Sequence, residues 1–154
     1  MGIASTSPNP CVNRSKTKNL WISFINDLNL DDVIELYKAS TLGERRPIDN
    51  RTCMAGMLQN ANLVVTAWDG DLMVGISRTI TDFHYCAYLS DLAVRASHQQ
   101  KGIGKELIKR TQAQLEPTAS LILLAAPAAA EYYPHVGFEN HPSAWILRSG
   151  QEIT

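Results

Sequence analysis

The segment from Tyr88 to Arg110 constrains the fold most, because it predicts a strand, a glycine turn and a helix in direct succession. Apolar and aromatic residues up to Val94 are typical of a strand. A polar turn follows, and Gly102 and Gly104 open an amphipathic helix. The first N–H groups of a helix have no partner within it, and glycine lets a ligand approach them closely. The segment therefore predicts a phosphate-binding turn, whose charge three nearby basic residues would balance: Arg95, Lys101 and Lys105.

Two nucleotide-binding motifs do not fit this turn. The dinucleotide fingerprint needs a third glycine three residues after the second, and that position is Leu107. The nucleoside-triphosphate loop needs Gly-Lys followed by Ser or Thr, whereas Glu106 follows Lys105 here. Both classes are excluded, which leaves the pattern Q-x-x-G-x-G from Gln99 to Gly104.

Directly after the strand residues Asp91 to Val94, this pattern resembles the acyl-CoA-binding motif of the GNAT N-acetyltransferase superfamily. The resemblance implies that acetyl-CoA is the cofactor and acyl donor. It implies a pyrophosphate held by the backbone of the whole turn: Gln99, Gln100, Lys101, Gly102, Ile103, Gly104 and Lys105. It also implies that the preceding strand splays from its neighbour and that three of its backbone N–H groups bind the pantetheine amides: those of Leu92, Ala93 and Val94.

A second motif, which runs from Tyr133 to Phe138, resembles the late GNAT signature of a tyrosine, a short spacer and Gly-Phe. The resemblance implies that Tyr133 lies beside the CoA sulfur as the general acid, because an O–H there can protonate the departing thiolate. Gly137 is expected to close a helix, and Phe138 to enter the core. Ala126 departs from the family, in which many members carry an asparagine at this distance before the tyrosine.

The general base is harder to assign. Something must take a proton from the attacking amine, and Asp91 and His84 are the side-chain candidates. A water chain to bulk solvent is an equal alternative. Strand alternation places Tyr88 and Ser90 on the face opposite Asp91, where several relatives carry a histidine or a carboxylate. These two hydroxyl residues are assigned to the substrate side.

Two adjacent arginines, Arg45 and Arg46, lie in a predicted loop over residues 41–47. They are either a solvated pair or a substrate-binding pair, one of which meets a carboxylate or phosphate in the acceptor site. The four histidines show no metal-ligand spacing, so no metal site is expected. A Gly-x-Ser-x-Gly nucleophile elbow is missing as well, which favours direct transfer in a ternary complex.

Periodicity predicts the other elements. Strands are expected at residues 20–25, 63–68, 72–80, 85–94, 120–125 and 144–148, and helices at 29–40, 52–58, 104–115 and 128–135. The run 120–125 is continuously apolar and is therefore predicted to be a buried central strand. Asp69-Gly70-Asp71 indicates a hairpin. The order resembles the GNAT fold: an α/β domain over residues 19–154, with a mixed, mostly antiparallel central sheet flanked by helices, after a flexible leader over residues 1–18.

Composition indicates which partners and which cellular compartment to expect. The 154 residues suffice for one domain, and a net charge of −1 gives no argument for nucleic-acid or membrane partners. No apolar run approaches the roughly 20 residues of a membrane-spanning helix. An odd set of three widely spaced cysteines suits a reducing cytosol, so a cytoplasmic location is expected.

The function predicted from these residues is an acetyl-CoA-dependent N-acetyltransferase, an acyltransferase enzyme whose acceptor is a small-molecule primary amine. The 41–47 loop is expected to shape the acceptor site. Two alternatives stay open at this point: an enzyme that acetylates proteins or peptides, and a non-catalytic acyl-CoA sensor. The resemblance also implies a homodimer, formed through the sheet edge or the last strand.

Overall fold

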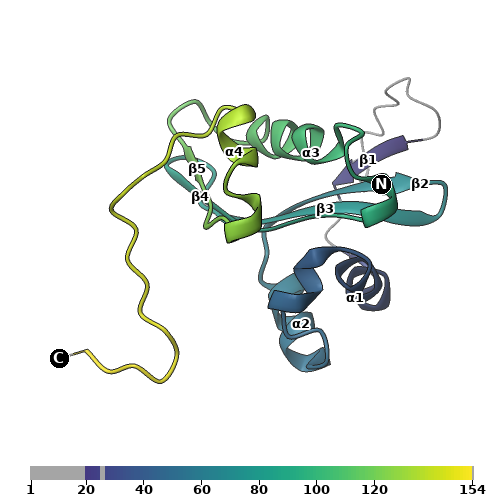
Figure 1. Cartoon of the computed structure of the whole chain (residues 1–154), viewed down its shortest axis with the longest axis horizontal. Helices are drawn as coiled ribbons and strands as arrows, with labels where there is room; N and C mark the ends of the chain where they lie inside the picture. The colour runs from purple at the N-terminus through teal and green to yellow at the C-terminus, as the bar shows by residue number, and fades with distance from the viewer. Residues whose placement is uncertain (1–19, 25–26, 154) are drawn as a thin grey trace, which may run out of the picture. The chain divides into compact units, whose positions relative to one another are not determined.

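The computed structural model describes residues 20–24 and 27–153 of the chain (Figure 1). By its internal contacts the chain divides into two compact units, Met1–Leu123 and Leu124–Thr154, which are described in turn. The predicted leader over residues 1–18 lies outside the described residues. The assignment of residues 19–154 to a single domain stays a prediction.

The first unit is built on a five-stranded sheet. Its strands are arranged in chain order, namely β1 (Leu20–Phe24), β2 (Leu63–Asp69), β3 (Leu72–Thr81), β4 (Cys86–Val94) and β5 (Ser120–Ile122). The first three pairings are antiparallel, and β5 lies parallel to β4. A parallel neighbour needs a crossover connection, and α3 (Ile103–Gln112) lies in the segment that joins β4 to β5. The predicted mixed, mostly antiparallel α/β sheet is confirmed.

Helices cover both faces of this sheet (Figure 1). On one face, α1 (Leu30–Lys38) begins at its cap Asn29, and α2 (Arg51–Gln59) begins at Asn50. Their apolar residues pack on one face of β2 and β3, and include Leu36 and Met54. On the opposite face α3 packs a second apolar cluster around Leu107. The predicted helices of this unit are thus confirmed, and each of the first two begins at an asparagine whose side chain caps it within a single turn.

The 41–47 segment is more ordered than a loop. It contains the 3-10 helix η1 (Thr41–Arg45), which is capped by the Ser40 side chain. The hairpin between β2 and β3 turns at Gly70 with φ +60°, as the Asp-Gly pattern predicts. A bulge also interrupts the β3–β4 ladder, because Arg78 pairs with Asp91 and Thr79 with Leu89. Ser90 is therefore the extra residue of that bulge.

The prediction that residues 120–125 form a buried central strand is wrong. The strand is limited to Ser120–Ile122, stands last in the strand order of the described sheet, and leaves Ile122 52% exposed. The predicted strand over residues 144–148 is not formed. A continuous apolar run is typical of a strand whose two faces are both covered by other elements, and the exposed Ile122 lacks that cover.

The second unit is short and has little regular structure. It contains the 3-10 helix η3 (Pro127–Ala129) and the single-turn helix α4 (Tyr132–His135), where the sequence predicted one helix over residues 128–135. Gly137 follows this turn with φ +98°, as expected of a helix-closing glycine. Residues 144–148 are extended and exposed, and Trp145 is 92% exposed.

Candidate functional site

The predicted phosphate turn lies between the end of β4 and the start of α3, after the 3-10 helix η2 (Ala96–His98). Gly102 is the N-cap of α3, with φ +80° and no capping side chain. The first backbone bond of the helix runs from Glu106 N to Gly102 O at 3.0 Å. Throughout the described chain, the backbone N–H groups of residues 100–105 have no hydrogen-bond acceptor. This row of free donors at a helix N-terminus fits an anion such as a pyrophosphate.

The start of α3 is fixed in place by close packing on β3. An added Cβ at Gly75 would lie 2.9 Å from Leu107 Cδ1 and 3.1 Å from Ile103 Cγ2. Glycine at this position therefore lets the helix approach the sheet. Of the predicted turn residues, Ile103 is consequently a buried core residue, which contributes its backbone alone to the turn.

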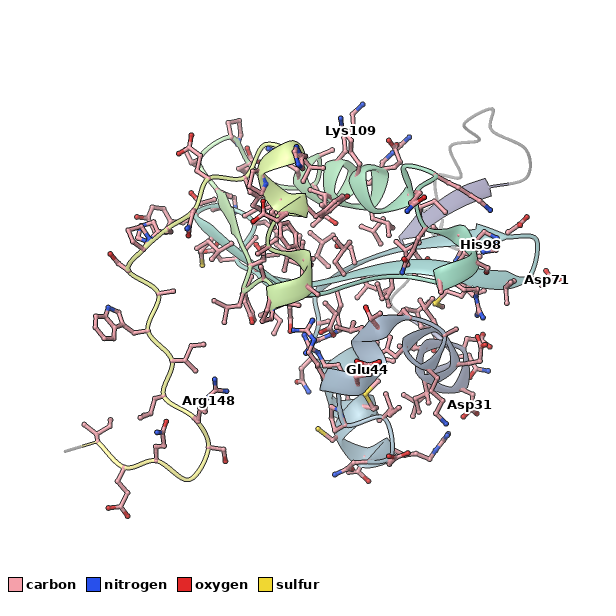
Figure 2. All side chains as sticks on the ribbon, viewed as in Figure 1. Asp31, Glu44, Asp71, His98, Lys109 and Arg148 are labelled. Atoms are coloured by element: carbon pink, nitrogen blue, oxygen red, sulfur yellow. The ribbon has the colours of Figure 1, made fainter. Side chains whose placement is uncertain are left out.

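The polar side chains of the turn mostly bind the turn itself. Gln99 Nε2 donates to Val94 O at 3.1 Å, and Lys101 Nζ donates to Ser97 O at 3.2 Å. Lys105 is exposed, and its position in the sequence keeps it next to the free N–H groups. Figure 2 shows His98 on η2 and Lys109 on the outward side of α3.

Arg95 does not serve the turn as predicted. Its guanidinium forms a two-pronged ion pair with Glu35 of α1 and also donates to Met73 O. The hydrogen bond with Glu35, aided by the attraction of its charge and opposed by burial, raises the pKa of Arg95. Arg95 thus connects the end of β4 to α1.

β4 has one open edge next to the turn. Its ladder with β5 ends at the pair Tyr88 and Ile122, where β5 itself ends, so no described strand pairs with this edge of β4 beyond Tyr88. Arg95 N donates to Val74 O of β3 at 2.9 Å. Because backbone groups alternate between the two edges of a strand, those of Leu92 and Val94 lie on the open edge. Ala93, the third predicted pantetheine donor, instead directs its backbone toward β3.

The buried centre of the unit is an ionic cluster around Asp91. This side chain has no solvent exposure. Its Oδ2 accepts from Tyr37 Oη of α1 at 2.8 Å and from Arg78 Nε of β3 at 2.5 Å. Its Oδ1 accepts from Arg46 Nε at 2.5 Å. These four side chains, Tyr37, Arg46, Arg78 and Asp91, are called the arginine cluster below.

The arginine cluster also holds the bulge of β4. Arg46 Nη2 donates to Ser90 O at 2.7 Å, and Arg78 Nη2 donates to Ser90 Oγ at 2.8 Å. Arg78 Nη1 reaches Met57 O of α2 at 3.1 Å. The cluster therefore connects both strands to α1, α2 and the segment after η1.

Three predictions change as a result. Asp91 is not placed as a general base, since both of its oxygens are occupied by donors within the core. Arg46 does meet a carboxylate, but this carboxylate is that of Asp91. Tyr88 is not on the face opposite Asp91, because the bulge at Ser90 shifts the alternation by one residue.

Sequence reasoning missed Tyr37 and Arg78 as members of the cluster. Tyr37 belongs to the apolar face of α1, so nothing in the sequence indicated a role for its hydroxyl. Arg78 offered a signal, because a charged residue within an otherwise apolar strand is rarely buried without a partner. Burial, together with the charge of Asp91 and its hydrogen bond, raises the pKa of the Tyr37 hydroxyl far above its usual value, so this hydroxyl is neutral.

The remaining predicted residues of the first unit are exposed. Arg45 is exposed, and its carbonyl accepts from Arg46 Nη1 at 2.9 Å. Tyr88 is 39% exposed. His84 is exposed in the turn before β4, where its backbone N–H donates to Asp82 Oδ1. Three such backbone donors, chiefly those of Tyr85 and Cys86, lower the pKa of Asp82 to about 2.

Tyr133, the predicted general acid, belongs to the second unit. Its ring makes edge contacts with Tyr132 at 5.4 Å and with Phe138 at 5.6 Å between centroids. Phe138 N donates to Tyr133 O at 3.1 Å, so the motif closes on itself. The Gly-Phe step thus fixes the tyrosine within its own unit.

The chain resembles known acetyltransferases in sequence. A family model for the acetyltransferase (GNAT) domain matches residues 39–152. The uncharacterized N-acetyltransferase ycf52 of Gracilaria tenuistipitata var. liui is 26% identical over 133 residues, which cover 84% of this chain and 72% of that protein. No helix within the described residues is long and apolar enough to cross a membrane.

Solved structures agree on the fold. A GNAT family acetyltransferase from Streptococcus pneumoniae is 26% identical, with a TM-score of 0.66 over 84% of this chain and 98% of that one. An aminoglycoside N-acetyltransferase in complex with CoA is 17% identical, with a TM-score of 0.67 over 90% of this chain and 100% of that one. At that identity, the second likeness shows the fold alone. The predicted GNAT-like fold is confirmed, and the chain belongs to the GNAT acetyltransferase family, whose members are acyltransferase enzymes.

Proposed function

We propose that this protein transfers the acetyl group of acetyl-CoA to a small-molecule primary amine. The observation that carries the proposal is the row of free backbone N–H groups over residues 100–105, at the N-terminus of α3 and beside the open edge of β4. A solved GNAT-fold structure that contains CoA supports the choice of donor. Acetyl-CoA supplies an activated thioester when bound.

The main chain would hold this donor. The N–H groups of residues 100–105 would bind the pyrophosphate, where the α3 dipole favours negative charge, whereas the N–H of Gln99 already donates to Ala96 O at 3.3 Å. The open-edge groups of Leu92 and Val94 would bind the pantetheine amides. Lys101 and Lys105 would add positive charge at the rim.

Tyr133 would act as the general acid in a direct transfer. A nitrogen–carbon bond to the amine forms as the carbon–sulfur bond breaks, and the phenol O–H protonates the departing sulfur. The proton of the amine must go elsewhere. Because Asp91 is held by three donors, His84 or a water chain would take it. Both assignments remain predictions.

Gly102→Asp tests the donor site. Saturating acetyl-CoA should raise the melting temperature of the wild type, and the variant should lose this shift. A carboxylate would repel the phosphates, and a side chain at φ +80° is strained by about 1–2 kcal/mol. Gly70→Asp is the matched control, since Gly70 also has positive φ and open space around it but lies in the β2–β3 turn. A wild type that shows no shift would sink the donor assignment.

Tyr133→Phe tests the acid. Turnover should fall about 100-fold or more, as typical for loss of general acid catalysis, while the acetyl-CoA dissociation constant stays within about twofold. Tyr132→Phe is the matched control in the same turn, because the two rings are in contact. Equal turnover of Tyr133→Phe and wild type would remove Tyr133 from the mechanism.

For the acceptor, only the chemical class is proposed. Aminoglycoside acetyltransferases share the fold, which supports a small-molecule amine. Release of CoA across an amine panel tests this assignment. Acetylation of peptides alone would indicate a protein acceptor, and acetyl-CoA binding without any product would indicate a sensor. Homodimer formation and a cytoplasmic location are further predictions.

A further inference from the structure

The arginine cluster carries more positive than negative charge. Two guanidinium groups, of Arg46 and Arg78, share the single carboxylate of Asp91. Among the described residues, Asp91 is the only acidic side chain that forms an ion pair with either arginine. Their other acceptors are neutral: the carbonyls of Arg45, Met57 and Ser90 and the hydroxyl of Ser90. One positive charge is therefore left without a counter-charge.

This surplus charge is only partly in contact with water. The side chain of Arg78 is 5% exposed, that of Asp91 is fully buried, and that of Arg46 is 22% exposed. Removing a charge from water is costly unless an opposite charge accompanies it. The nearest acidic side chain along the chain, Glu44 on η1, is exposed and forms no ion pair within the described residues (Figure 2). The surplus charge thus favours an added anion.

Arg46 is able to bind such an anion. A guanidinium has five N–H groups, and Arg46 donates through Nε, Nη1 and Nη2 to three acceptors of the protein. Two N–H groups remain, on the side chain that is the more exposed of the two arginines. A planar fork of this kind matches a carboxylate better than a point charge does.

An exposed apolar row lies on the same face of the sheet. Ile80 pairs with Tyr88, and Tyr88 pairs with Ile122, so the three side chains form one row across β3, β4 and β5. They are 48%, 39% and 52% exposed, respectively. Ile80 stands two residues after Arg78 on β3, and side chains two residues apart share a face.

We propose that Arg46, supported by Arg78, is the anion subsite for the acceptor, and that the acceptor is an amine that also bears a carboxylate. The apolar row of Ile80, Tyr88 and Ile122 would contact its apolar body. The bond from Arg46 Nη2 to Ser90 O places this subsite at the bulge of β4, two residues before the open-edge residue Leu92. The inference rests on the proposed function. It also disfavours polycationic aminoglycosides as acceptors, because like charges repel.

Benzoate binding tests the subsite without any catalysis. Isothermal titration should show saturable binding of benzoate to the wild type and none of benzyl alcohol, its neutral analogue. Arg46→Gln should weaken benzoate binding about tenfold or more, and Arg46→Lys, which keeps the charge but not the fork, should weaken it less. Arg51→Gln is the charge-matched control, because Arg51 forms an ion pair with the exposed Asp31, away from the arginine cluster.

Two results would overturn the subsite. The first is a wild type that does not bind benzoate, or that binds benzyl alcohol equally well. This test uses the unaltered protein, so it holds even if Arg46→Gln fails to fold. The second is a folded Arg46→Gln that binds benzoate as the wild type does.

A pair of acceptors, one with a carboxylate and one without, tests whether the subsite acts in catalysis. Phenylalanine should have a kcat/KM about tenfold or more above that of phenethylamine, mainly through KM, and Arg46→Gln should abolish this preference. Equal kcat/KM values for the two amines in the wild type would overturn the role of Arg46 in specificity. An equal loss of kcat/KM for both amines in Arg46→Gln would overturn it as well. If acetyl-CoA does not bind while benzoate does, the proposed function fails and the anion subsite stands.

Discussion

The donor turn and the arginine cluster both favour anions, but they are built in opposite ways. The turn is one contiguous stretch over residues 100–105, and its donors are backbone N–H groups. The cluster is made of side chains that are 13, 45 and 54 residues from Asp91 along the chain. A site made of main chain follows from local sequence, whereas a site made of distant side chains needs the whole fold.

Their electrostatics differ as well. The turn draws its positive character from the dipole of α3 and from backbone N–H groups that have no acceptor among the described residues. The cluster draws it from formal charges that are nearly all removed from water. Side-chain changes should therefore have small effects in the turn and large effects in the cluster.

Asp91→Ala should have the largest effect on stability. It leaves two guanidinium groups in the core without their carboxylate, and breaking a buried pair in this way costs about 3–5 kcal/mol of unfolding free energy. Urea unfolding measures the change. Arg51→Gln, which breaks the exposed pair with Asp31, is the control and should leave the midpoint unchanged. Similar midpoints for the two variants would contradict the contrast drawn between buried and exposed charges.

Tyr37→Phe should have an intermediate effect. It removes one buried hydrogen bond to the charged Asp91 and keeps the ring, so the expected loss is about 1.5–3 kcal/mol. The same urea titration measures it. Asp91 keeps both arginines in this variant, so a loss as large as that of Asp91→Ala would show that the phenol, and not the ion pairs, holds the cluster together.

Lys101→Ala should have the smallest effect. The turn binds through its backbone, and the lysine is exposed, so the acetyl-CoA dissociation constant should rise no more than about fivefold and stability should stay unchanged. Titration calorimetry measures the constant. A loss as complete as that expected for Gly102→Asp would show that the turn depends on side-chain charge rather than on its main chain.

Several features of the fold were correctly predicted from the sequence. The helices α1 and α2, the turn at Gly70 and the succession of β4, turn and α3 all depend on residues within a few positions of one another. The motif from Gln99 to Gly104, together with the order of elements, then led by resemblance to the GNAT-like sheet.

The sequence predictions that failed are those that depend on distant neighbours. Residues 120–125 were predicted to be a central strand, but β5 is limited to Ser120–Ile122 and stands last in the described sheet. Tyr88 was placed on the wrong face because alternation cannot reveal a bulge. Asp91 was considered as a base because its partners Tyr37, Arg46 and Arg78 are far from it in sequence.

The sequence by itself thus determined the glycine turn over residues 100–105, since glycine conformation and unpaired helix N–H groups are local properties of the chain. Only the tertiary structure decided the state of Asp91, the role of Arg46 and the surplus positive charge beside β4. The physical reason is that burial and charge pairing depend on which side chains packing brings together, and four separate elements contribute to this cluster.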